Sequence, residues 1–87
     1  MPMKILVKFL VFDLPPGFRD AEFILPEDAR VGDVFDACLG LFVERGVTMD
    51  EKELRTATVI VGDKWLEPVD PLSEGDIITI IRPMDGG

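Results

Sequence analysis

Hydrophobic and polar residues alternate along the first dozen positions of the chain. In residues 3–12 apolar side chains recur at every second position, which is the period of a strand with one buried face. The apolar face comprises Met3, Ile5, Val7, Phe9 and Val11. Lys4 and Lys8 fall on the opposite face. A turn rich in Pro and Gly follows at 13–17, and the short apolar run 21–25 is expected to pair back as a hairpin.

Between residues 31 and 45 the period changes to that of an amphipathic helix. Asp33 in the expected first turn and Arg45 in the last suit the helix dipole, and Gly46 stands where a left-handed cap belongs. Cys38 lies on the apolar stripe, so we interpret it as a small buried hydrophobe rather than a reactive thiol. The stripe consists of Val31, Val34, Phe35, Cys38, Leu41 and Phe42.

The second half of the chain predicts a further helical turn and three more strands. Thr48 to Glu51 fits a capping box, so a short helix is expected over 49–54. Strands are expected at 57–61, 64–66 and 77–82. We expect Trp65, in the short middle strand, to cap the core.

This order predicts an α+β fold in which a mixed sheet of four to five strands wraps around one main helix. The first and last strands are the most apolar, so they are expected to lie side by side in the middle. Ile78 and Ile80 would face the helix, whereas Ile77, Thr79 and Ile81 would face away. Leu6, Leu10, Phe12 and Ile81 would then form an outward apolar patch that marks an interface, unless loops cover it.

Composition narrows the classes of function. The chain of 87 residues is expected to form one domain, and it has no apolar run of the length that a membrane span needs. With no signal-peptide pattern at its start, we expect a soluble, cytoplasmic protein without a membrane partner. The absence of histidine excludes Ser-His and Cys-His pairs, and one cysteine supplies neither an internal disulfide nor a four-thiolate cluster. No metal site is therefore expected.

The net charge of −8 argues against nucleic acid, because the nine Lys and Arg residues are scattered. An acidic surface suits docking onto a basic protein, although it also simply keeps a small domain soluble.

The last third of the chain carries a specific frame of residues. Pro71-Leu72 is followed by Gly75-Asp76 before an apolar strand, and then by Pro83 and a terminal Gly86-Gly87. Together with the element order, this frame resembles the MoaD/ThiS sulfur-carrier family of ubiquitin-like β-grasp proteins, nearer to the small subunit of molybdopterin synthase than to the thiamine branch. The motif-level likeness is confined to residues 59–87.

Two positions depart from the family pattern. Arg82 stands where the family often has a second Pro, and Asp85 stands where a small neutral residue is usual. Arg82 is expected to offset the charge of Asp85 or to pair with an acidic group of the partner.

The resemblance implies that residues 1–82 form the β-grasp domain and 83–87 a flexible tail. It implies that a partner adenylyltransferase, similar to ubiquitin-activating enzyme, uses ATP to adenylate the Gly87 carboxylate. Sulfur from a donor then gives a thiocarboxylate. The chain would be a carrier without catalysis of its own and without a bound cofactor, and it would deliver sulfur to molybdopterin with a larger synthase subunit.

The tail residues suit threading into a partner. Gly86 has no Cβ and admits close approach of partner atoms, and Pro83 stiffens the base of the tail. Fully extended, residues 83–87 reach roughly 17 Å. Partner contacts are expected from Leu6, Leu10, Phe12, Ile81, Arg82, Pro83, Met84 and Asp85. Three alternatives stay open: a protein modifier conjugated through Gly87, a carrier for thiamine or another sulfur-containing product, and a plain binding module with an idle tail.

Overall fold

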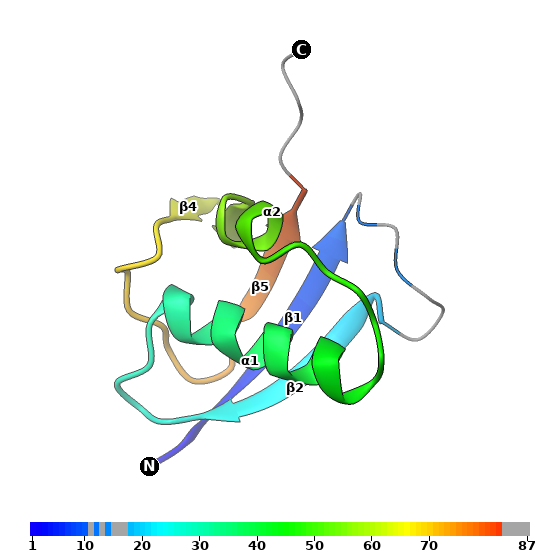
Figure 1. Cartoon of the computed structure of the whole chain (residues 1–87). Coiled ribbons are helices and arrows are strands. Elements are labelled where there is room, and N and C mark those ends of the chain that lie inside the picture. The colour runs from blue at the N-terminus through cyan, green and yellow to red at the C-terminus, as the bar shows by residue number, and fades with distance from the viewer. Residues whose placement is uncertain (11, 13, 15–17, 83–87) are drawn as a thin grey trace.

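The computed structural model describes residues 1–10, 12, 14 and 18–82 (Figure 1). Its elements are β1 (Met3–Leu10), β2 (Asp20–Leu25), α1 (Val31–Glu44), α2 (Glu51–Arg55), β3 (Thr58–Val61), β4 (Lys64–Leu66) and β5 (Ile77–Ile81). The five strands form one sheet in the order β2-β1-β5-β3-β4, and α1 lies across one face of it. This is the ubiquitin-like β-grasp, so the predicted fold class is confirmed. Neither described helix is long and apolar enough to cross a membrane.

The two most apolar strands lie side by side at the centre, as predicted. β1 and β5 are parallel, with Leu6 opposite Ile77 and Leu10 opposite Ile81. β2 pairs with the other edge of β1, and β3 with the other edge of β5, both antiparallel. Because β5 has a strand on each side, the end of the described chain is fixed firmly in the sheet.

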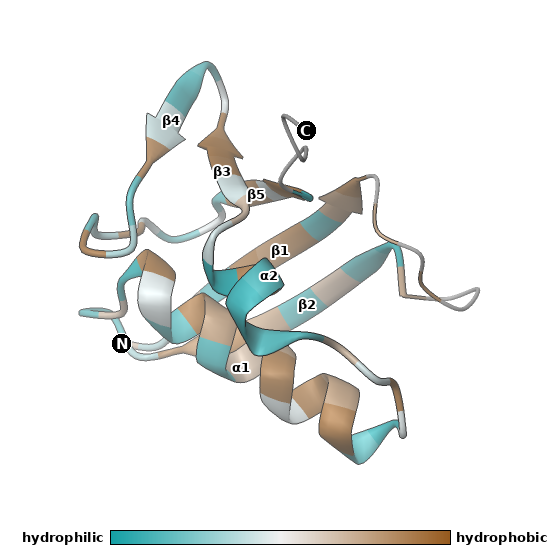
Figure 2. Cartoon of the chain, turned by 45° about the horizontal axis from the view of Figure 1, so that its top comes forward, coloured by the Kyte–Doolittle hydropathy of each residue, from teal (hydrophilic) through white to brown (hydrophobic). Residues whose placement is uncertain are grey.

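The hydrophobic core lies between α1 and the sheet, where the apolar face of the helix meets the central strands (Figure 2). Alternation in β1 is confirmed for Met3, Ile5, Val7 and Phe9, which are all buried, while Val11 lies outside the described residues. Ile78 and Ile80 are fully buried, as predicted. On the helix stripe Leu41 is the exception: it is only partly buried, because it lies at the flank of α1 beside the edge strand.

The start of α2 differs from the prediction. Its N-cap is Asp50 rather than Thr48, and the Oδ1 atom of Asp50 accepts a hydrogen bond from the backbone N–H of Lys52 at 3.0 Å. A carboxylate at this position also suits the positive end of the helix dipole. The helix therefore covers Glu51–Arg55 rather than 49–54.

Part of the Pro-Leu and Gly-Asp frame has a structural role at the entry to β5. Gly75 adopts a φ of 81°, and its N–H donates to the carbonyl of Lys4 at 2.9 Å. The Oδ2 atom of Asp76 accepts from the N–H of Ser73 at 2.8 Å and closes the turn. Leu72 is buried beside Ala29 and donates its N–H to that residue's carbonyl. These contacts set the register of β5 against β1.

Candidate docking face and C-terminal end

The face of the sheet opposite α1 carries several apolar side chains beside the exposed Lys4 and Lys8 of β1. Residues directly opposite each other on paired strands share a face. Leu6 therefore lies with Ile77, and Leu10 with Ile81, on the side away from the helix. Thr79 is on the same side of β5 as Ile77 and Ile81. The same rule therefore extends this surface over β3 and β4, because Ile60 lies opposite Thr79 and Trp65 lies opposite Ile60. We call this surface the outer face, and its apolar residues are Leu6, Leu10, Ile60, Trp65, Ile77 and Ile81.

The outer face is open to solvent in the described part of the chain. Leu10 is 48% exposed, Ile77 50% and Trp65 77%. The other three are partly buried. An exposed apolar surface that continues over several strands is typical of a protein-protein interface. Of the residues expected to dock a partner, Leu6, Leu10 and Ile81 lie on it.

The predicted position of Phe12 is wrong. β1 ends at Leu10, so the alternation that would have placed Phe12 on the outer face stops two residues before it. The Phe12 side chain instead packs against the core, with its ring edge-on to that of Phe9 at a centroid distance of 6.1 Å.

Trp65 was expected to cap the core, and this is also wrong. On the three-residue strand β4 the neighbouring Leu66 lies opposite the buried Val59 and takes the inward position. Trp65 therefore points outward and joins the outer face. Sequence reasoning missed both Trp65 and Ile60 as surface residues, because their placement depends on the β3–β4 register. Ile77 was predicted to face away from the helix but was not assigned to the site.

The described chain leaves the sheet at one rim of the outer face. The N–H of Arg82 donates to the carbonyl of Leu10 at 3.2 Å, so β1 holds the chain as far as this residue. The Arg82 guanidinium forms an ion pair with Glu53 of α2, a partner that the sequence pattern did not indicate. Pro83, Met84, Asp85, Gly86 and Gly87 lie outside the described residues. Arg82, the last described residue, lies next to Leu10 and follows Ile81 directly.

Cys38 is fully buried against the sheet, which confirms its interpretation as a small hydrophobe. Burial raises the pKa of its thiol to about 12, so the thiol stays protonated at neutral pH. Among residues 1–10, 12, 14 and 18–82, no group of three or more His, Cys, Asp or Glu side chains is arranged to hold a metal ion.

Neither a family model nor a curated protein matches the sequence. Solved structures do match. A Pyrococcus furiosus protein described as molybdopterin converting factor, subunit 1, aligns over 94% of this chain and 99% of its own, with a TM-score of 0.71 and 23% identity. A structure of Haloferax volcanii small archaeal modifier protein 1 aligns over 97% of this chain and 99% of its own, with a TM-score of 0.69 and 27% identity.

A Caldiarchaeum subterraneum ubiquitin aligns over the whole of both chains, with a TM-score of 0.63 and 16% identity. The protein thus has the ubiquitin-like β-grasp fold and is similar over nearly its whole length to a molybdopterin converting factor subunit and a small archaeal modifier, as its sequence resemblance predicts.

Proposed function

We propose that this protein is a ubiquitin-like sulfur carrier whose Gly87 carboxylate is activated by a partner enzyme. The observation that carries the proposal is the position of the chain end: β5 is held between β1 and β3, and Arg82 follows it at the rim of the exposed outer face. A partner that covers Leu10 and Ile81 has the start of the tail beside it. The terminal Gly86-Gly87 then supplies a reacting carboxylate on a backbone without side chains.

The chemistry proceeds in two balanced steps. The Gly87 carboxylate oxygen attacks the α-phosphorus of ATP, a new P–O bond forms, and pyrophosphate leaves. A hydrosulfide sulfur then attacks the acyl carbon, the bond to AMP breaks and AMP leaves, and loss of the sulfur's proton gives a thiocarboxylate. The partner adenylyltransferase binds ATP and uses the sulfur donor, and the carrier itself holds no cofactor.

Molybdopterin formation with a larger synthase subunit, in the cytoplasm, is the acceptor reaction that we favour. The likeness to the molybdopterin converting factor subunit and the Pro-Leu, Gly-Asp and Gly-Gly frame support it. Conjugation of Gly87 to lysine side chains is the second candidate, favoured by the likeness to small archaeal modifier protein 1.

Intact-mass spectrometry tests the proposal. The protein is incubated with ATP, a sulfide source and an adenylating enzyme from its own cell. We expect a gain equal to one sulfur in place of one oxygen, mapped to Gly87 and absent when Gly87 is deleted. An unchanged mass with an enzyme that loads another carrier in parallel would contradict the proposal.

Gel electrophoresis under denaturing conditions separates the two candidates. A modifier produces a ladder of Gly87-dependent conjugates in its own cells, and a dedicated carrier does not. Sulfur loading without a ladder favours the carrier, whereas a ladder without loading favours the modifier.

A further inference from the structure

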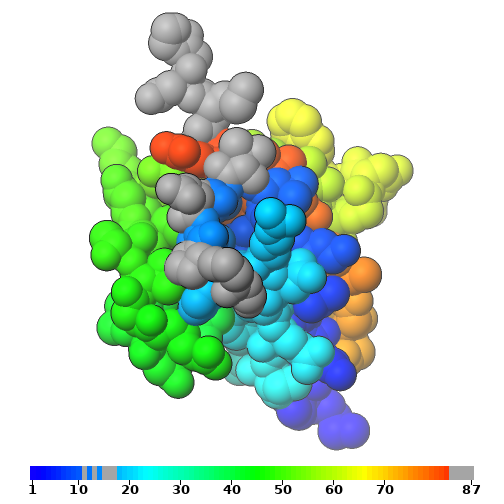
Figure 3. All heavy atoms as spheres, turned by 90° about the vertical axis from the view of Figure 1, so that its right-hand side faces the viewer, coloured from blue at the N-terminus to red at the C-terminus, as the bar shows by residue number. Residues whose placement is uncertain are grey.

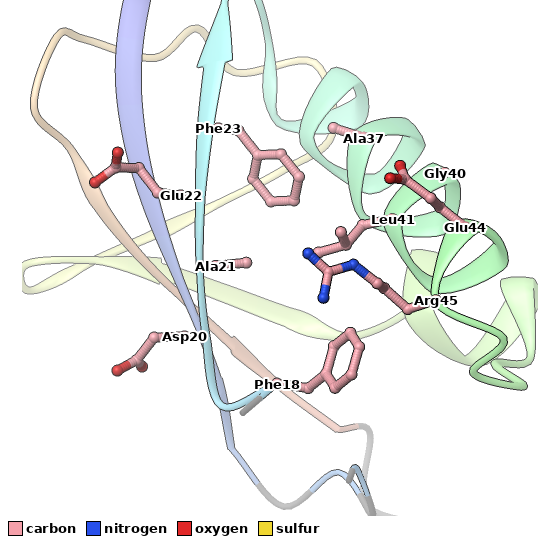
Figure 4. Close-up of a pocket in the computed structure, with 10 residues that line it drawn as sticks. All are labelled: Phe18, Asp20, Ala21, Glu22, Phe23, Ala37, Gly40, Leu41, Glu44 and Arg45. Atoms are coloured by element: carbon pink, nitrogen blue, oxygen red, sulfur yellow. The ribbon is translucent and has the colours of Figure 1, made fainter. Parts of the chain in front are cut away.

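A groove runs between the edge strand β2 and the C-terminal half of α1 (Figure 4). Its volume is about 650 Å³. Ala21 and Phe23 project into it from β2, and Ala37 and Leu41 project from α1. We call this feature the edge groove. Asp20, Glu22, Glu44 and Arg45 also line it, and the Arg45 side chain points into it. Viewed from this side of the molecule, β2 and the helix lie next to each other (Figure 3).

The backbone of β2 has hydrogen-bonding groups that face the open side of the sheet. The N–H of Phe9 donates to the carbonyl of Arg19 at 2.8 Å, which makes these two residues a hydrogen-bonded pair. Such pairs alternate along an antiparallel ladder, so Asp20, Glu22 and Ile24 direct their N–H and C=O groups away from β1.

The opposite residues on β1 show the same alternation. Leu6, which pairs with Glu22, donates its N–H to the carbonyl of Asp76. Lys4 accepts a hydrogen bond at its carbonyl from the N–H of Gly75. Both therefore direct their backbone groups toward β5 and not toward β2. Since β2 is the outermost strand, its outward groups are available to pair with an added strand.

The side chains of β2 define what such a strand must contain. Side chains on the groove side of an added strand would meet Ala21, Phe23 and Leu41 beside the Arg45 guanidinium, so apolar residues fit there better than Lys or Arg. Side chains on its other side would lie beside Asp20 and Glu22, which point away from the groove in Figure 4. Opposite charges on neighbouring strands attract and like charges repel, so Lys or Arg fits there.

We propose that the edge groove binds an extended segment of a partner protein in which apolar residues alternate with Lys or Arg. A second copy of this chain does not meet that requirement, because pairing β2 with β2 brings Asp20 and Glu22 of two chains of net charge −8 together. The inference is independent of the proposed function, because it uses the β2 edge and neither the apolar residues of the outer face nor the tail.

The test is an NMR titration of the full chain with an eight-residue synthetic peptide of alternating valine and lysine. We expect the largest shifts at the amides of Asp20, Glu22 and Ile24, and slower hydrogen exchange there. The matched control peptide alternates valine and glutamate and is expected to bind at least tenfold more weakly.

Two pairs of measurements on variants locate the site. Gly40 lines the groove and nothing lies within 4 Å of a Cβ built on it, so Gly40→Trp is expected to place a ring in the groove and to weaken binding at least tenfold. Gly40→Ala, the matched control, leaves the groove open and binding unchanged. Glu22→Lys is expected to weaken binding of the valine-lysine peptide by roughly fivefold and to strengthen binding of the valine-glutamate peptide.

Several results would overturn the proposal. They are no shift at millimolar peptide, equal binding of both peptides, shifts that map to Leu10 and Ile77 on the outer face, or concentration-dependent shifts at β2 without peptide, which would indicate pairing of two copies. Sulfur loading of Gly40→Trp is measured in parallel and is expected to match that of the original chain, so failure of the carrier function and failure of the groove are distinguishable.

Discussion

At the scale of single residues, the burial of Cys38 makes the free energy of unfolding depend on pH. Burial raises the pKa of its thiol to about 12, whereas an unfolded cysteine titrates near 8.5. From about pH 9 to 12 the unfolded chain therefore binds fewer protons than the folded chain, and the free energy of unfolding falls as pH rises. Below this window the thiol is protonated in both the folded and the unfolded chain, so it does not make the free energy of unfolding change with pH.

We predict that this loss approaches about 1.4 kcal/mol per pH unit in that window. Urea unfolding at several pH values measures it. Cys38→Ala is the control: it lowers stability at every pH because it leaves a cavity, but its stability should decline less steeply above pH 9. Parallel slopes for the two proteins would show that the thiol does not titrate as we expect.

Replacing either of two glycines by alanine is expected to change the free energy of unfolding, but in opposite directions. Gly40 lies inside α1, and a Cβ there meets nothing within 4 Å, so Gly40→Ala should raise the free energy of unfolding by about 0.5–1 kcal/mol. Gly75 has a φ of 81°, so Gly75→Ala should lower it by about 1–2 kcal/mol. Denaturant midpoints measure both changes, and equal signs would contradict the assigned backbone conformations.

Sequence pattern located most buried residues but misplaced those near the ends of elements. Phe12 follows the alternation of β1, yet the strand ends at Leu10 and the alternation no longer determines its side. Thr48 and Asp50 both suit an N-cap, and the local backbone selects the carboxylate. A pattern predicts which face a side chain occupies only while the element continues, and the end of an element depends on contacts that are distant in sequence.

At the scale of elements, the central pair of β1 and β5 followed from hydrophobicity, because the two most apolar strands gain most from burial on the sheet. The register of this pair could not be predicted from hydrophobicity, because it depends on the backbone hydrogen bonds from Gly75 to Lys4 and from Leu6 to Asp76. The sequence therefore predicted that Leu10 and Ile81 share a face, but not that Trp65 extends this face through the β3–β4 pairing.

The outer face gives a prediction that separates docking from stability. Leu10→Glu places a charge on this face, where the native side chain is 48% exposed, and should reduce sulfur loading by a partner enzyme at least tenfold. Val43→Glu is the matched control, because Val43 is 79% exposed on α1, across the sheet from this face. Both variants should unfold at similar urea concentrations. Equal loading of the two would remove the outer face from the docking interaction.

At the scale of the whole molecule, the order of elements was enough to predict the β-grasp, because one helix and five short strands have few compact arrangements. The frame at the end of the chain pointed to the carrier chemistry. Its Gly75-Asp76 part is explained by the turn before β5, so the proposed carrier function depends on the Gly-Gly terminus. The edge groove had no sequence signal, since β2 and α1 meet only in the folded chain.

The net negative charge of the chain lowers its stability but speeds its association with a cationic peptide. The chain has 17 acidic and 9 Lys or Arg residues, and its radius of gyration is 12.3 Å. At about 0.01 M salt the screening length of roughly 30 Å exceeds this radius, so the excess carboxylates repel one another across the fold. At about 0.15 M it is roughly 8 Å, and the repulsion is largely screened.

We therefore predict that stability rises when salt is raised from about 0.01 to 0.15 M at pH 7, while the association rate of the valine-lysine peptide falls. Thermal unfolding measures the first change and stopped-flow fluorescence the second. Near pH 4.3, the isoelectric point, both dependences should nearly vanish, because the net charge that causes them is gone. A salt effect of the same size at both pH values would assign it to surface hydration instead of charge.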